Sequence, residues 1–525
     1  MRAYGKFSLL LLIFIGMLMP GMVSAQKKTK IRLVQAEQMQ GDKTTGEELN
    51  IFVGDVIFEH DSAYLFCDSA VFNSSRNNLD AYHDVRIKVS DTLNLYGDFL
   101  HYEGNSRVAT VTGDVKLEDN DATLYTDRLI YERNTKIAYY TTGGEIISED
   151  NNLTSWRGFY YTDQKELYFK DSVVLINPEY TLRSDTLIFN TLTEIALISG
   201  PTTIVGEDEF LYAEDGWYNT QTDETELKVN PYLIYKEQYL SGDSIYYEKE
   251  SGKGHVIGDV MMKDTVQNVI VKSQLADYNR KSGYAWATDS AMAILIDGSD
   301  SLFMHADTLR MTFDTTESPQ NLLAYYKCKY YKSDLQGMSD SLVYSFTDSI
   351  ITMYREPALW TQGNQLTADL IKIFSSGEKI DSMYMSNSSF IISIDEFNRD
   401  NFNQIKGKNM IGYFKENELY LIKVEGNSET VYYVREEDGA LIGINKALSS
   451  NMEIWVEDRQ ISDIFYFDQA DANLFPENEF PPEERRLKNF IWLDEERPKS
   501  KTDIFIWDAR AENQPVLRPP DFVPE

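Results

Sequence analysis

The sequence predicts an all-β fold made from a long series of short repeats. Two phrases recur along the chain, and successive copies of the first start 28 to 33 residues apart. Between the phrases, apolar and polar residues alternate with a period of two, and β-branched and aromatic residues dominate. We therefore expect an elongated array of about twelve repeats, each of about 30 residues and four short strands.

The composition indicates a folded chain and argues against nucleic acid as a partner. The 525 residues include 84 acidic and 50 basic side chains, which give a formal net charge of −34. Hydrophobic residues make up 42% and aromatic residues 13%, too much for a disordered acidic chain. So negative a surface argues against sequence-independent binding of nucleic acid, because such binding depends on Lys and Arg. We expect no nucleic-acid partner.

Residues 1–25 have the pattern of a secretory signal peptide. Arg2 and Lys6 precede an apolar run over residues 7–19, and small residues occupy positions 23–25. The apolar run is short for a bilayer core of about 30 Å. We therefore predict cleavage after this segment and a mature chain that begins near Gln26.

The first repeated phrase is an acidic or polar residue, then an aliphatic residue two positions later and an aromatic residue four positions later. Eleven copies begin between Asp68 and Asp369. Because the aliphatic and the aromatic residue are two apart, they share one face of a sheet. The clearest pairs, which we expect to point inward, are Leu100 with Tyr102, Leu129 with Tyr131, Leu187 with Phe189, and Ile245 with Tyr247.

The second phrase lies between copies of the first. Its clearest forms begin with Gly54-Asp55, Gly113-Asp114 and Gly258-Asp259, and each continues with valine. Glycine and aspartate favour turns. We therefore expect this phrase to separate consecutive strands, with the apolar residues after it starting the next one.

No arrangement of residues is typical of a catalytic or metal site. None of the five histidines lies at ligand spacing from another, and neither a nucleophile elbow nor a phosphate-binding loop occurs. The repeated aspartate is more typical of turn capping, since a catalytic residue would appear once. We predict no catalytic residue, metal or cofactor, and a protein that is not an enzyme.

The repeats resemble those of the OstA family. The resemblance is carried by Asp98–Glu103, Asp127–Glu132 and Gly242–Glu248, alternating with Val53–Phe58 and Thr112–Leu117, and it covers roughly residues 31–430. That family includes LptA, the periplasmic bridge of lipopolysaccharide transport, and the N-terminal domain of LptD. The resemblance implies a β-jellyroll of two sheets in a V, whose apolar interior holds acyl chains while head groups stay in water.

The resemblance also implies a function and partners. The chain would be a periplasmic protein, associated with outer-membrane assembly, that shields lipopolysaccharide acyl chains between the two membranes. The eight inward residues of the first phrase would line its groove. Implied partners are the lipid A acyl chains, other OstA-like or Lpt-like jellyroll proteins joined end to end, and an LptD-like barrel in the outer membrane.

The residues alone leave two other interpretations open. Inward leucines and aromatic residues would equally fill the closed core of a structural or adhesive protein of the cell envelope. A carbohydrate-active β-solenoid is the third interpretation, because paired carboxylates across a groove could cleave glycosides.

Three segments are expected along the chain: the signal peptide (1–25), the repeat array (26–430) and a C-terminal extension (431–525) with a few strands and a proline-rich tail. Eight of the 14 prolines follow residue 475. Cys67 and Cys328 lie about nine repeats apart, so we expect the two thiols to stay unpaired, because a disulfide needs Cα atoms within about 7 Å.

Overall fold

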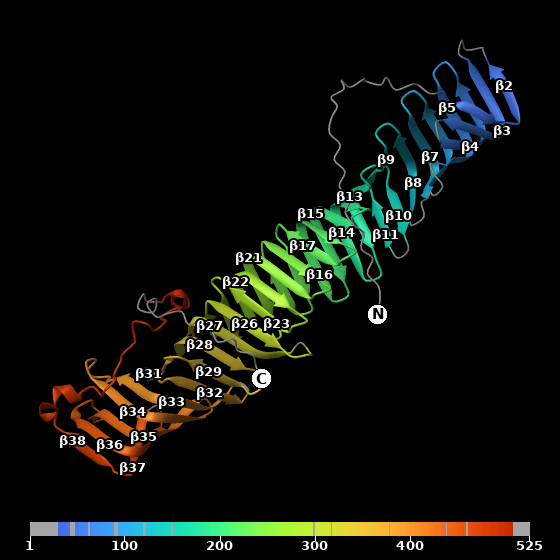
Figure 1. Ribbon diagram of the computed structural model, residues 1–525. Coiled ribbons are helices and arrows are strands. Elements are labelled where there is room, and N and C mark those ends of the chain that lie inside the picture. The colour runs from blue at the N-terminus through green and yellow to red at the C-terminus, as the bar shows by residue number, and fades with distance from the viewer. Residues whose placement is uncertain are drawn as a thin grey trace, which may run out of the picture. The chain divides into compact units, whose positions relative to one another are not determined.

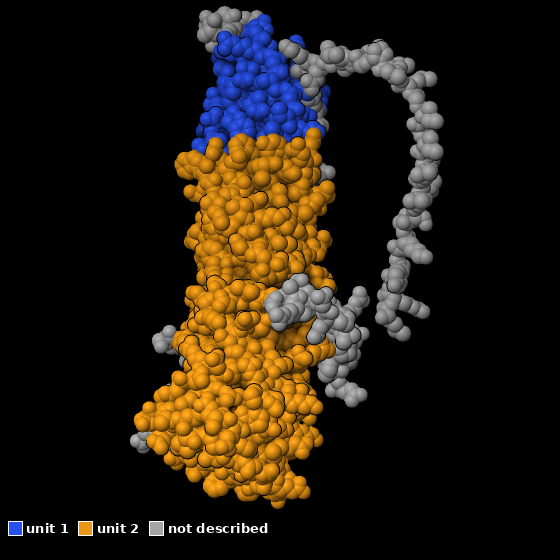
Figure 2. All heavy atoms as spheres, turned by 90° about the vertical axis from the view of Figure 1, so that its left-hand side faces the viewer, with its two compact units in different colours: residues 1–149 blue, residues 150–525 orange. Residues whose placement is uncertain are grey.

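The computed structural model describes residues 30–507, apart from 43–47, 61–62, 89–92, 119–121, 149–150, 298–299, 317, 377–378, 437 and 458–459. The predicted signal peptide and the prolines from Pro515 onward lie outside the described residues. The chain divides into two compact units, unit 1 (residues 1–149) and unit 2 (residues 150–525) (Figure 2). The described residues form 38 strands and three short 3-10 helices, which confirms the all-β fold class. Within them, no helix is long and apolar enough to cross a membrane.

The described part of unit 1 contains ten strands. These are β1 (Arg32–Gln35), β2 (Gln38–Asp42), β3 (Leu49–His60), β4 (Ala63–Asn73), β5 (Asn78–Lys88), β6 (Asn94–Glu103), β7 (Val108–Glu118), β8 (Thr123–Glu132), β9 (Ile137–Tyr140) and β10 (Gly144–Ser148).

The long strands of unit 1 each belong to two sheets. Antiparallel pairing joins the first half of β3 to the second half of β4, and the second half of β3 to the first half of β4. The same exchange continues through β5, β6, β7 and β8. The first sheet begins with β2 and ends with β9, whereas the second begins with β1 and ends with β10. Two layers of strands therefore face each other across one interior.

Unit 2 repeats this scheme with more strands. These are β11 (Asn151–Ser155), β12 (Arg157–Tyr161), β13 (Glu166–Ile176), β14 (Tyr180–Asn190), β15 (Ile195–Gly206), β16 (Glu209–Asn219), β17 (Glu224–Lys228), β18 (Tyr232–Tyr235), β19 (Gln238–Ser241), β20 (Ser244–Glu248), β21 (Lys253–Asp264), β22 (Val269–Asn279), β23 (Tyr284–Thr288), β24 (Met292–Asp297), β25 (Asp300–His305), β26 (Thr308–Phe313), β27 (Pro319–Tyr331), β28 (Leu335–Ser345), β29 (Ile350–Tyr354), β30 (Ala358–Thr361), β31 (Asn364–Thr367), β32 (Leu370–Ser376), β33 (Lys379–Ile394), β34 (Phe402–Lys415), β35 (Glu418–Arg435), β36 (Leu441–Glu457), β37 (Gln460–Phe467) and β38 (Asp471–Phe475), followed by the 3-10 helices η1 (Glu477–Glu479), η2 (Pro482–Glu484) and η3 (Asp503–Phe505).

In unit 2 the first sheet runs from β12 to β37, and the second sheet runs from β11 to β38 (Figure 1). Long strands such as β15 and β21 contribute one half to each sheet, whereas in places two short strands take the place of one long strand. Residue 430, the expected end of the array, lies within β35, and paired strands continue to Phe475.

The Gly-Asp phrase bends a strand, contrary to the expectation that it separates two strands. Gly54 and Asp55 have φ of 83° and 40°, and both lie inside β3. Val53 faces Ser69 and Val56 faces Cys67, so two residues of β3 oppose one residue of β4. Such a bulge kinks a strand sharply. Repeated in β7 and β21, it turns the strand from one sheet into the other.

The aspartate of the first phrase packs beside the glycine of the second. A Cβ on Gly258 would collide with the carboxylate of Asp243, and one on Gly113 would approach Asp98 Oδ2 to 2.6 Å. The two phrases are therefore parts of one corner, contributed by neighbouring strands. The corner requires a residue with a positive φ and no Cβ beside the aspartate, and glycine satisfies both requirements.

A C-terminal strap, residues 476–507, returns along the outer face of the second sheet. Gln404 receives the N–H of Leu487 and donates to the carbonyl of Arg485, both at 2.8 Å. Gln365 holds Leu493 N–H and Ile491 O in the same way, both at 2.7 Å. The strap therefore crosses β34 first and β31 next, so it runs back toward earlier strands.

The strap ends its described course over β25 and β27. Lys329 Nζ donates to the carbonyls of Glu496 at 3.0 Å and Ile506 at 2.9 Å, and it lies 4.9 Å from the ring centroid of Trp507. The Phe505 ring centroid lies 4.5 Å from that of His305. Apolar strap residues join an outer-face cluster with strands β33 to β36, which includes Phe390, Phe402, Tyr433, Ile444, Phe480 and Leu487. The predicted extension is therefore packed against the array over its described residues.

We predict that Gly258→Ala destabilises the protein by about 1–3 kcal/mol, because alanine resists φ of 73° and its Cβ meets Asp243. The urea unfolding midpoint measures this loss. Gly254→Ala, on the same strand, is the control, since its Cβ would make only ordinary contacts at 3.7 Å or more. Equal midpoints for the two variants would contradict the corner's role.

We predict that Gln404→Leu loosens the strap, because it leaves the Arg485 carbonyl and the buried Leu487 N–H without their partner. Each unpaired buried group costs about 1–3 kcal/mol. Hydrogen exchange should accelerate over residues 485–507 while the strand amides stay protected. Lys415→Ala, an exposed change on the same strand, should leave strap exchange unaltered.

Candidate functional site

An inner row of aliphatic side chains lines the bend of the first sheet. In unit 1 it includes Leu100 and Leu129, which are 1% and 2% exposed. In unit 2 it includes Leu187 and Ile245, which are 4% and 6% exposed. Cross-strand pairing keeps the row in step, since Leu100 faces Val111, which faces Leu129. These four predicted residues therefore form the floor of the interior, shielded from solvent.

A second row, the first-sheet rim, lies two residues further from the bend. It contains the other four predicted residues, Tyr102, Tyr131, Phe189 and Tyr247, all partly exposed. From Phe189 to Met311, large rim residues alternate with small ones: Phe189 faces Ala196, and Tyr247 lies between Thr225 and Gly254. In this stretch Tyr247 has only small rim neighbours on the first sheet, whereas Phe189 also faces Leu167.

The hydroxyls of two rim tyrosines, Tyr102 and Tyr218, form hydrogen bonds with polar side chains. Tyr102 Oη lies 2.6 Å from Nδ1 of His60, and the Tyr218 hydroxyl donates to the carboxylate of Asp223. Burial, together with this hydrogen bond, raises the pKa of Tyr218. Both rings thus combine an apolar body with a hydroxyl that meets a polar side chain, His60 or Asp223.

The second sheet has a matching rim that the sequence analysis did not single out. It passes from Leu211 through Leu233 and Leu240 to Met262, residues paired strand to strand. The first three are partly exposed and Met262 is 38% exposed. The sequence contains a signal for this row. Apolar and polar residues alternate next to the second phrase, and each of these residues lies a few positions from the bulge in its strand or in the neighbouring strand.

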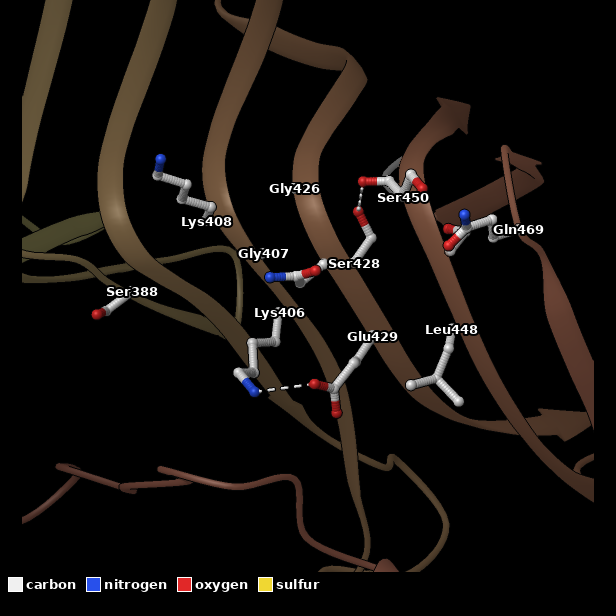
Figure 3. A pocket seen from close by; sticks show the side chains of 12 residues that line it. Ser388, Lys406, Gly407, Lys408, Gly426, Ser428, Glu429, Leu448, Ser450 and Gln469 are labelled. Carbon is white, nitrogen blue, oxygen red and sulfur yellow. Dashed lines mark hydrogen bonds and ion pairs between the residues drawn. The ribbon is translucent and has the colours of Figure 1, made fainter.

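A separate polar hollow of about 500 Å³ lies at the corners of β33 to β36 (Figure 3). Lys406 donates to Glu429 at 3.0 Å across its wall, and Ser428 donates to the carbonyl of Ser450. Lys408, Gly426 and Gln469 also line it. None of the predicted site residues lies there, and its lining is polar, in contrast to the two rims.

The described residues contain no group of three His, Cys, Asp or Glu side chains that could hold a metal ion. Cys67 and Cys328 are both free and buried, as expected from their separation. Burial raises the pKa of each thiol to about 12. Neither thiol therefore carries appreciable thiolate, the reactive form, at neutral pH.

Comparisons with known proteins agree with the repeat pattern. Residues 28–185 match the family of OstA-like protein. Among solved structures, the chain is similar to LptH, described as the LptA homologous periplasmic component of the conserved lipopolysaccharide transport device from Pseudomonas aeruginosa. That match has 13% identity and a TM-score of 0.19, and it covers 20% of this chain and 81% of LptH. No curated protein matches the sequence.

We predict that iodoacetamide at pH 8 leaves both cysteines unmodified in the native protein, because burial removes access and raises both pKa values to about 12. Both should react once urea unfolds the chain. Intact mass spectrometry counts the adducts. Rapid modification of either thiol without denaturant would mean that its part of the interior is open.

Proposed function

We propose that this chain, which over residues 28–185 belongs to the OstA-like family, binds lipopolysaccharide by its acyl chains and carries it across the periplasm. The observation that supports this most directly is the pair of partly exposed apolar rims that face each other above a buried floor. Tyr247 on the first sheet and Leu240 on the second are examples.

The rims suit an acyl chain in both chemistry and shape. A flexible hydrocarbon can occupy the space beside small rim residues such as Ala196 and Gly254, with the rings of Phe189 and Tyr247 as walls. Burial of apolar surface would supply the affinity, at about 0.8 kcal/mol for each methylene removed from water. The interaction is non-directional, so it tolerates sliding along the row.

The charge distribution suits a lipid held by its tails. With a formal net charge of −34, the protein would repel phosphorylated head groups that approached its acidic outer surface closely. Screening limits this repulsion to about 8 Å at physiological salt. Tails in the interior and head groups in water keep the two sets of charges apart.

Location and partners follow from the same proposal. A cleaved signal over residues 1–25 would deliver the chain to the periplasm. Open edges at the ends of the two sheets would pair with other OstA-like jellyrolls end to end, or with an LptD-like partner at the outer membrane. The role is transport without catalysis, and no cofactor enters it.

A photoreactive benzoylphenylalanine at position 247 should form an adduct with lipopolysaccharide in living cells, because Tyr247 belongs to the rim. The same residue at position 246 is the matched control, since Tyr246 points to the opposite face of β20. Immunoblotting for lipopolysaccharide on the purified protein measures the yield.

Equal yields at positions 246 and 247, or none at 247, would contradict lipid binding in the interior. Depletion of the protein provides a second readout, since lipopolysaccharide should then accumulate at the inner membrane. Normal export during depletion, together with a weakened cell envelope, would favour the structural alternative.

A further inference from the structure

The side chains of the first-sheet rim differ in solvent exposure along unit 2. From Phe189 on β14 to Ile351 on β29, its residues are partly exposed. From Ile373 on β32 to Ile454 on β36, its side chains are buried, whereas Ile464 on the edge strand β37 is partly exposed: Ile373 is 6% exposed, Met383 5% and Ile454 0%. The row itself is unbroken, because Ile351 pairs with Ile373 and Ile373 with Met383. The same strip of sheet is thus accessible upstream and sealed downstream.

The second-sheet rim closes over the same part of the array. Met262 is 38% exposed, and its neighbour Val271 is partly exposed. Beyond them, Met304 is 6% exposed, Tyr330 5% and Leu359 0%. Both rims therefore lose their exposure toward the C-terminus, between β24 and β32.

The strap covers the sealed section from outside. Lys329, Gln365 and Gln404, which hold the strap, alternate along their strands with the interior residues Tyr330, Leu366 and Ile405. Their side chains therefore point to the opposite, outer face of the second sheet. From β25 to β34 this sheet is packed on both faces, by the interior on one side and by the strap on the other.

Packing on both faces resists the movement that would admit a ligand. An acyl chain could enter the sealed section only if the sheets moved apart, which would break the contacts of buried rim side chains such as Met383 and Ile454. The strap opposes movement of the second sheet, because its paired bonds to Gln365 and Gln404 connect three neighbouring strands of that sheet, β31, β33 and β34.

We infer that the interior is a groove closed at its C-terminal end, where both rims are buried, the strap braces the second sheet from outside, and acyl chains are excluded. This inference rests on the proposed function. Lipid therefore occupies the section with exposed rims, between β13 and β29 in unit 2, and leaves it through the open side between the rims. Lipid therefore does not pass through the C-terminal end of the groove.

Methionines on the two rims allow a direct test without substitutions. The full-length protein, produced with photo-methionine, is irradiated with purified rough lipopolysaccharide, and adducts are located by mass spectrometry. We expect adducts at Met262, which is 38% exposed, and at Met311, which is partly exposed, and at least tenfold fewer at Met304 and Met383, their buried counterparts in the same rows. Met261, which points to the outer face beside Met262, is the internal control.

The outcomes separate this inference from the proposed function. Adducts at Met304 and Met383 that match those at Met262 and Met311 would overturn the closed end and leave lipid binding intact. Absence of adducts at all four would overturn both.

A second measurement tests the strap. In the variant Gln365→Leu/Gln404→Leu, labelling at Met383 should rise at least threefold, while labelling at Met311 stays constant. Circular dichroism checks that the variant keeps its strands. Unchanged labelling at Met383 in a variant whose strap residues exchange faster would overturn the strap's part in the closure.

Discussion

The structure depends on one constraint, the register of each strand as it passes around the corner between the two sheets. Two residues on one strand oppose a single residue on the next, and this mismatch recurs in step along the chain. Because side chains alternate between faces, a slip of one residue would turn the inner row outward and expose it to water. The corner therefore keeps the row from Leu187 to Met452 continuous.

With this register fixed, the solvent exposure of the interior differs along the chain with the side chains on the two rims. Upstream, from Phe189 to Met311, large residues such as Tyr247 alternate with small ones such as Gly254, and the rim is partly exposed. Downstream, Ile373, Met383 and Ile454 are buried, and the same row also contains Gly412, which faces Met383. One backbone scheme thus carries partly exposed rims in one section and buried rims in another.

The strap explains why two glutamines are buried on the outer face of the second sheet in the downstream section. A buried glutamine costs free energy unless its amide is hydrogen-bonded. Gln365 and Gln404 are 0% and 1% exposed, and each binds one carbonyl and one N–H of the strap backbone. Recognition at these two points is by main-chain groups, so it does not depend on the side chains of Arg485, Leu487, Ile491 or Leu493.

The sequence by itself determined the strands, the period of the repeat and the inward direction of residues such as Leu129 and Tyr131, because side-chain alternation and repeat spacing are local properties. It also suggested the family, through phrases that recur in register. Only the tertiary structure decided that Gly258-Asp259 bends a strand, since a turn and a bulge draw on the same residue types. The strap was likewise beyond the sequence, because Gln365 meets Leu493 across 128 residues and no local pattern encodes so distant a contact.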